Sequence, residues 1–297
     1  MTVVLESRAL SKRYGRRQAL SDCTLSIPAG RIAGLVGPNG AGKTTLLHLA
    51  VGLLTPTSGT IEVLGERPPS TPQQLARVGF VAQETPTYAG LSIADHLKLG
   101  ARMNPGWDAA LARRRIESLG LDPRQKAGKL SGGQRAQLAL TLAVAKRPEF
   151  LILDEPVASL DPLARREFLQ GLMAAAVEHE LSVLLSSHLV ADLERVCDYL
   201  IVLTDSRVQL CGDTEELLAS HLLLTGPRCD PAALPSGWQV ISASHTDRQT
   251  TLLIRTDEPV SDTAWAVNQI SMEDLVLAYM SKAAIAPDRD LTLEVQR

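Results

Sequence analysis

Gly37-Pro38-Asn39-Gly40-Ala41-Gly42-Lys43-Thr44 follows a short apolar run at residues 32–36 and precedes apolar residues at helical spacing. A strand, a glycine-rich turn and a helix in the pattern G-x-x-x-x-G-K-[ST] are typical of a phosphate-binding loop. Its glycines let successive backbone N–H groups face one anion, and the helix adds its positive N-terminal end. Lys43 would then meet the terminal phosphates, and the Thr44 hydroxyl, beside Thr45, suits Mg²⁺. We expect a nucleoside triphosphate site.

A second pattern lies at residues 150–155, where the apolar run Phe-Leu-Ile-Leu ends in Asp154 and Glu155. Carboxylates at the carboxyl end of a buried strand face the crevice in which α/β sheets bind ligands. A helical pattern at about 162–178 separates this run from apolar runs at 181–186 and 199–203. Such alternation predicts an α/β fold with a mostly parallel sheet and right-handed crossovers.

Leu130-Ser131-Gly132-Gly133-Gln134 lies between these two patterns and precedes a helical stretch that runs to about residue 145. The Ser131 hydroxyl and the N–H groups of the two glycines form a second phosphate-binding surface, again at a helix N-terminus. The alternative is that this turn only caps its helix in a monomeric enzyme.

These three motifs, in this order, resemble those of the ATP-binding-cassette (ABC) family of ATPases, over residues 3 to about 213. The resemblance implies a P-loop NTPase (RecA-like) core sheet, an N-terminal antiparallel β subdomain and an inserted α-helical subdomain at about 84–146. Residues 214–297 read as a small C-terminal α+β appendage, because prolines and glycines there separate short strand patterns. Ser271-Met272-Glu273-Asp274 is typical of a capping box, opening a helix whose apolar stripe docks on its own domain.

The resemblance also implies roles for individual residues. Tyr14 corresponds to the aromatic residue that stacks on adenine. Asp154 would hold Mg²⁺ through water, and Gln83 would contact both Mg²⁺ and the catalytic water. Glu155 would orient and polarise that water, and His188 would contact the γ-phosphate.

The same resemblance implies that two copies are needed. Many ATPases stabilise the leaving phosphoryl group with an arginine from outside the site, and the sequence indicates no arginine of this chain for that task. In the family, the surface from Ser131 to Gln134 closes over ATP held by the opposite subunit, and Asp161 lies at the joint. We expect a head-to-tail homodimer, or a pair with a homologous cassette, that forms on ATP.

Composition limits the partners of the chain. It has 297 residues, 45% hydrophobic, with a formal net charge of -3, whereas nucleic-acid-binding chains are more often basic. The triplet Arg113-Arg114-Arg115 is typical of a solvated helix face. Four cysteines (Cys23, Cys197, Cys211 and Cys229) contain no C-x-x-C pair, which argues against a zinc site and fits a reducing cytosol. No apolar stretch approaches the ~20 residues that span a bilayer.

Two functions fit these observations. In one, this ATP-binding subunit drives separately encoded, integral membrane permease subunits from the cytoplasmic face, docking a short permease helix beside Gln83 and the segment through about Leu99. In the other, it is a soluble ABC ATPase of translation or DNA repair, but such relatives usually carry a second cassette or long insertions. Residues 104–108 and 271–275 are similar to stretches of bacterial drug and antibiotic (ABC-2-type) exporter ATPases. We therefore expect export of a drug, antibiotic or lipid-like compound.

Overall fold

The computed structural model describes residues 2–68, 71–84, 87–228, 234–235, 237–260 and 263–285, so that Cys229 lies outside the described residues. The chain divides into two compact units, Met1–Thr214 and Glu215–Arg297. In the described part, every helix is too short or too polar to cross a bilayer.

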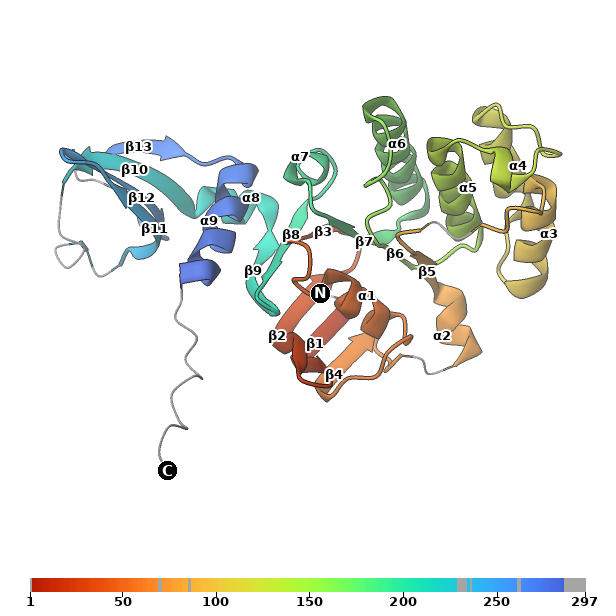
Figure 1. Ribbon diagram of the computed structural model, residues 1–297, viewed down its shortest axis with the longest axis horizontal. Coiled ribbons are helices and arrows are strands. Elements are labelled where there is room, and N and C mark those ends of the chain that lie inside the picture. Colours follow the sequence, from red (N-terminus) through yellow and green to blue (C-terminus); the bar gives the residue numbers. More distant parts are fainter. Residues whose placement is uncertain are drawn as a thin grey trace. The chain divides into compact units, whose positions relative to one another are not determined.

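A six-stranded sheet forms the centre of the first unit (Figure 1). Its strands, in spatial order, are β5 (Val78–Val81), β6 (Phe150–Leu153), β7 (Ser182–Ser187), β3 (Ile32–Val36), β8 (Tyr199–Thr204) and β9 (Arg207–Asp213). All neighbours pair in parallel except β8 and β9, which are antiparallel. Both β6 and β7 are buried along their whole length, as is typical of central strands in a parallel sheet. The expected mostly parallel sheet is confirmed.

The expected antiparallel β subdomain is also present. β1 (Val3–Tyr14) lies between β2 (Arg17–Pro28) and β4 (Ser58–Val63). The two residues between β1 and β2 form a tight hairpin turn in which Gly15 has a φ of +58°. Apolar side chains of this sheet share one core with helix α1 (Lys43–Ala50), which fixes the phosphate loop between the two sheets.

Helices make up most of the segment between β5 and β6. They are α3 (Ile93–Met103), α4 (Ala109–Ser118), the 3₁₀ turn η1 (Ala127–Lys129) and α5 (Gly132–Ala145), preceded by α2 (Pro72–Arg77) before β5. Ser92 and Asp95 form a capping box at α3, and Asp108 caps α4. Buried apolar side chains from all three α-helices, such as Ile93, Ile116 and Leu138, hold this helical layer together. Two further helices, α6 (Pro162–His179) and α7 (Val190–Leu193), flank β7 in the sequence.

One expectation for α4 is wrong. Arg113 and Arg114 are exposed, but Arg115 is half-buried. Its guanidinium group lies against α6 near Gly171, where a Cβ would meet a guanidinium nitrogen at an ordinary contact distance of 3.6 Å. Burial lowers the pKa of Arg115, so only two of the three arginines form a solvated face.

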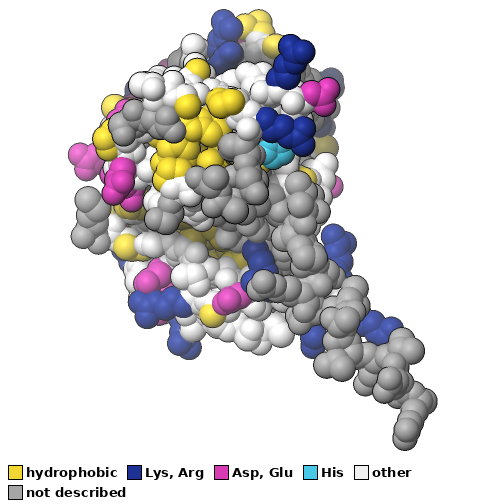
Figure 2. All heavy atoms as spheres, turned by 90° about the vertical axis from the view of Figure 1, so that its left-hand side faces the viewer, with side chains coloured by type: hydrophobic (Ala, Val, Ile, Leu, Met, Phe, Trp, Pro, Cys, Tyr) yellow, Lys and Arg dark blue, Asp and Glu magenta, His cyan; other side chains and the backbone are white. Residues whose placement is uncertain are grey.

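The second unit contains a four-stranded antiparallel sheet in the order β11-β12-β10-β13. Its elements are α8 (Thr214–Ala219), β10 (His221–Pro227), β11 (Gln239–His245), β12 (Gln249–Arg255), β13 (Ala266–Gln269) and α9 (Met272–Ile285). The amide N–H of Asp274 donates to the Ser271 hydroxyl at 3.1 Å, as a cap requires. Apolar residues of α9, among them Leu275 and Val276, are buried, so the stripe docks on its own unit. Figure 2 views this unit and shows apolar side chains gathered between charged ones.

Candidate nucleotide-binding site

The phosphate loop connects β3 to α1 and needs its glycines for two reasons. Gly40 and Gly42 have φ of +84° and +110°, which L side chains rarely adopt. A Cβ on Gly37 would collide with the carbonyl oxygen of Leu203, and one on Gly42 with that of Ala19. The loop is therefore held between β8 and β2.

Lys43, the first residue of α1, points its ammonium group into this loop. Its Nζ donates to the carbonyl oxygens of Gly37 at 2.6 Å and Pro38 at 3.3 Å, and lies 3.2 Å from Oε1 of Glu155. The Lys43 side chain is only 6% exposed. A buried ammonium group requires such partners, and the loop thus holds a fixed positive charge.

Asp154 and Glu155 follow the last residue of β6, and both are buried. A single serine of β7 holds the two: the Glu155 amide N–H donates to Oγ of Ser186 at 2.8 Å, and that hydroxyl donates to Oδ1 of Asp154 at 2.8 Å. Glu155 also has a φ of +48°. Left-handed backbone at a non-glycine residue costs on the order of 1–2 kcal/mol and is concentrated at functional sites. Ser186 was not among the residues predicted from the sequence.

His188 follows β7 directly, and its Nδ1 lies 2.6 Å from Oε2 of Glu155. The hydroxyl of Ser187 forms the turn beyond the strand by accepting from the Leu189 amide at 3.0 Å. Lys43, Glu155 and His188 therefore form one connected chain across the ends of β3, β6 and β7. The sequence predicted all three residues, and the structure brings them together.

A hollow of ≈ 500 Å³ lies over the phosphate loop. Its walls include ten of the expected residues: Tyr14, Pro38, Asn39, Gly40, Gly42, Lys43, Thr44, Thr45, Gln83 and Glu155. Tyr14 is 46% exposed, and the Lys12 ammonium group lies 5.4 Å from its ring centroid. Arg17 lines the same hollow and was not among the residues expected from the sequence. The sequence signal that could have identified Arg17 was the two-residue hairpin turn, because such a turn pairs Arg17 with Tyr14.

Ser131 to Gln134 lie elsewhere in the chain. Ser131 is the N-cap of α5: its hydroxyl accepts from the Gln134 amide at 3.2 Å, and the Gln134 side chain accepts from the Ser131 amide at 3.0 Å. Ser131, Gly133 and Gln134 line a separate hollow of ≈ 200 Å³ that includes Ala164 of α6 but no phosphate-loop residue. A Cβ on Gly133 would come within 2.8 Å of the Ala164 Cβ.

Asp161 caps the neighbouring helix α6, accepting from the amides of Leu163 and Ala164 at 3.0 Å each. It therefore belongs to the same region as Gly133, which contacts Ala164. Ten of the expected residues therefore line one hollow, and three others, Ser131, Gly133 and Gln134, line a different one.

Comparisons with known proteins identify the family of this chain. A family described as "ABC transporter" matches residues 20–158. The "Nod factor export ATP-binding protein I" of Cupriavidus pinatubonensis is 37% identical over 232 residues, which are 75% of this chain and 70% of that protein. The "Thiamine import ATP-binding protein ThiQ" of Salmonella choleraesuis is 36% identical over 67% of this chain and 86% of its own length.

Solved structures are similar as well. One described as "Structure of ATP binding subunit of ABC transporter" has 28% identity and a TM-score of 0.65, covering 73% of this chain and 92% of its own. A nucleotide-free ATP-binding cassette from an ABC transporter, at 22% identity and a TM-score of 0.63, shares the fold. With the relatives above, these likenesses show that the chain belongs to the ATP-binding subunits of ABC transporters, a family of enzymes that bind and hydrolyse ATP.

Proposed function

We propose that this subunit hydrolyses ATP in the hollow over the phosphate loop, with Glu155 as the group that polarises the attacking water. The connected chain of Lys43, Glu155 and His188 is the observation that carries the proposal. Phosphate in the loop competes for the Lys43 ammonium group, so that Glu155 Oε1 becomes available to accept a proton from water. His188 keeps the other carboxylate oxygen in place and, at the rim, can reach the γ-phosphate.

The oxygen donors around the loop fit Mg²⁺. Thr44 supplies a hydroxyl, Gln83 an amide carbonyl and Asp154 a carboxylate, and Mg²⁺ takes oxygen ligands of these kinds together with phosphate oxygens. The Ser186 hydroxyl supports this assignment by holding one Asp154 oxygen at 2.8 Å. When bound, Mg²⁺ would neutralise charge on the terminal phosphates.

The exposed Ser131 surface supports a head-to-tail pair in which each copy closes the other's site. Its hydroxyl and the amides at the start of α5 form an anion-binding helix terminus. Since it shares no hollow with the phosphate loop of its own chain, its anion would be the ATP of another copy. Asp161 lies in the same region and would sit at the joint.

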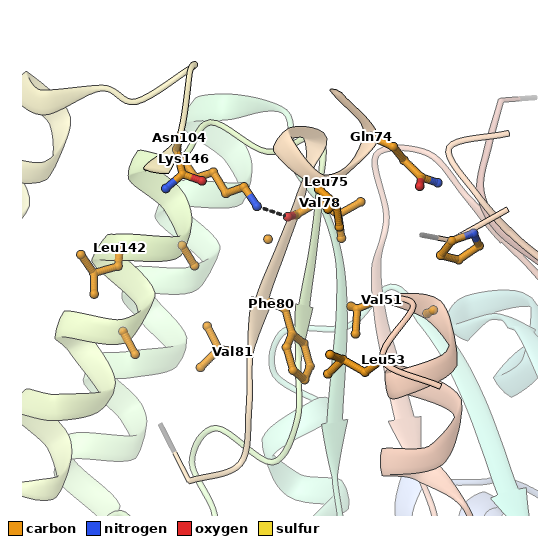
Figure 3. Close-up of a pocket in the computed structure, with 15 residues that line it drawn as sticks. Val51, Leu53, Gln74, Leu75, Val78, Phe80, Val81, Asn104, Leu142 and Lys146 are labelled. Atoms are coloured by element: carbon orange, nitrogen blue, oxygen red, sulfur yellow. Dashed lines mark hydrogen bonds between the residues drawn. The ribbon is translucent and has the colours of Figure 1, made fainter. Parts of the chain in front are cut away.

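An apolar groove supports docking of a permease segment. The groove, of ≈ 400 Å³, is lined by the end of α1, α2, β5 and one face of α5 (Figure 3). Leu53 and Leu75 on its walls are 63% and 48% exposed, which is high for leucine. Lys146 closes one end by donating to the Val78 carbonyl at 2.8 Å. β5 runs along this groove and ends two residues before Gln83, which lines the nucleotide hollow. A permease segment bound in the groove could therefore respond to the nucleotide through β5 and Gln83.

Cysteine crosslinking in membranes that contain the whole transporter tests the groove. Leu75→Cys should crosslink to a cytoplasmic segment of the permease. Val177→Cys, 80% exposed on α6, is the matched control and should not. Crosslinking that is equal at both sites, or absent from Leu75→Cys, would contradict this docking site.

We infer export as the direction and a drug-like, antibiotic or lipid-like compound as the cargo. The similarity to a Nod factor export protein supports this direction, while the thiamine import protein is nearly as similar. ATP-driven transport in inside-out membrane vesicles tests it, since an exporter accumulates cargo there and an importer does not.

A further inference from the structure

The hairpin between β1 and β2 presents two side chains to the nucleotide hollow. Tyr14 and Arg17 are directly opposed across the strands, on either side of the turn at Gly15 and Arg16. Directly opposed residues of an antiparallel pair project from the same face. Both line the hollow, so the turn brings a guanidinium group and a tyrosine ring to the same wall of the site.

Arg17 also reaches the tip of the phosphate loop. A Cβ on Gly40 would lie 3.5 Å from a guanidinium nitrogen of Arg17. That spacing is an ordinary van der Waals contact, so the guanidinium group lies next to the loop at Gly40. The guanidinium group therefore lies between the tyrosine and the loop that holds phosphate.

The charges around the hollow leave Arg17 available for an anion. Glu155 is the acidic residue that lines the hollow, and it pairs with Lys43 and His188. In the part of the chain that the structure describes, no hydrogen bond or ion pair engages the Arg17 side chain, whose backbone pairs in the β1–β2 ladder. A guanidinium group is suited to a phosphate, since its planar set of donors can bind two phosphate oxygens at once.

We propose that Arg17 binds the triphosphate of ATP as a second cation, in addition to Lys43. This inference rests on the proposed nucleotide site. Arg17 acts in binding rather than in the chemical step, because it stands at the loop tip and not in the chain from Lys43 to His188. Its removal therefore raises KM and leaves kcat nearly unchanged.

The test is calorimetric titration of the full-length protein with ATP, in EDTA to prevent turnover, and with adenosine. Arg17→Ala should weaken ATP binding about tenfold, as expected for one exposed charge-assisted hydrogen bond, and leave adenosine binding unchanged. Arg17→Lys should recover part of the loss, because it keeps the charge. With Mg²⁺, steady-state hydrolysis by Arg17→Ala should show the same rise in KM.

Two further variants make the result decisive. Arg16→Ala removes the neighbouring exposed arginine, which does not line the hollow, and should bind ATP like the wild type. Lys43→Ala should lose ATP binding. If Arg17→Ala matches Arg16→Ala, or loses ATP and adenosine by the same factor, Arg17 does not bind the triphosphate. If Lys43→Ala also binds ATP normally, the proposed nucleotide site itself is wrong.

Discussion

The phosphate-loop region and the Ser131 region are built differently. In the first, charged side chains are buried and meet one another: Lys43 contacts Glu155, and Glu155 contacts His188. In the second, Ser131 is exposed, and among the described residues its hydroxyl bonds only within its own helix cap. One region is held together by internal contacts between charged side chains, while the other presents polar groups outward.

This difference indicates what each region needs. Buried charges are costly unless paired, so the first region must be assembled within one chain. An exposed helix terminus is stable alone and gains from an anion that arrives from outside. We infer that the two regions act on the same ATP from different molecules.

The largest expected effect separates chemistry from binding within the first region. Glu155→Gln keeps the side-chain volume but removes the base, so hydrolysis should fall by ~10²–10⁴ while ATP binding persists. Phosphate release and ATP titration measure the two. Glu149→Gln, at an exposed pair with Arg77 just before β6, is the control and should hydrolyse ATP normally. Normal turnover by Glu155→Gln would remove Glu155 from its role.

A substitution in the Ser131 region should lower the rate of hydrolysis nearly as much. Ser131→Arg places a bulky side chain on the anion-binding surface, and hydrolysis should fall by ~10² because phosphate-stabilising donors are lost. ATP binding to the isolated subunit should be unaffected, since this region lines a different hollow. Ser118→Arg, at the exposed end of α4, is the matched control. If Ser131→Arg weakened the binding of ATP to the isolated subunit, the Ser131 region and the phosphate-loop region would not be independent within one chain.

Removing the serine that holds both carboxylates should have an intermediate effect. Ser186→Ala leaves the Glu155 amide and the Asp154 carboxylate without their shared hydroxyl. We expect about a tenfold loss of kcat and a loss of ~1–3 kcal/mol in the free energy of unfolding, measured in denaturant. Ser187→Ala removes only a local turn bond and should cost less in both. Equal losses in the two variants would mean that the Ser186 hydroxyl contributes no more to kcat or stability than the local turn bond of Ser187.

The smallest effect concerns the second unit, outside both regions. His221 is buried, its Nδ1 lies 2.6 Å from the Leu217 carbonyl, and its Nε2 lies 2.9 Å from the Tyr279 hydroxyl. Burial and then the nearby Arg255 charge lower the His221 pKa below its ordinary 6.5, against the raising effect of the Leu217 bond. His221 therefore binds a proton at a higher pH in the unfolded chain than in the folded unit. This contribution to stability is present above about pH 6.5 and is lost as pH falls toward the folded pKa.

Thermal unfolding, monitored by tryptophan fluorescence at pH 7.5 and 5.5, tests this pH dependence of stability. The wild-type Tm of the second unit should drop at the lower pH, because there the unfolded chain binds the His221 proton more readily than the folded unit does. His221→Gln should lower the Tm at both values and reduce the drop, whereas His245→Gln should keep it. An unchanged drop in His221→Gln would assign the effect to other groups.

Local motifs predicted much of this site because strand, loop and helix are consecutive in the chain. The phosphate loop, Asp154 and Glu155 each follow a buried strand, and parallel strands bring their carboxyl ends to one edge. Ser186 and Arg17 were missed because their roles depend on neighbouring strands. The sequence of β7 alone does not show that one of its serines meets Asp154, nor that of β2 that Arg17 faces Gly40.

The same limit applies to the fold. β13 was not anticipated, because all four of its residues are exposed and carry no alternating apolar pattern. Arg115 was assigned to a solvated face, because helix α6, which Arg115 contacts near Gly171, is distant in the sequence. In both cases the deciding contact joins residues that are distant in the sequence.

Mixing two inactive variants tests the shared site most directly. Lys43→Ala disables the phosphate loop but keeps the Ser131 surface, and Ser131→Arg does the reverse. If each site takes one region from each molecule, half of the dimers in an equal mixture contain both variants, and each of these mixed dimers has one intact site out of two. The mixture should therefore regain up to about a quarter of wild-type hydrolysis. A mixture that is no more active than the two variants measured separately would contradict the account.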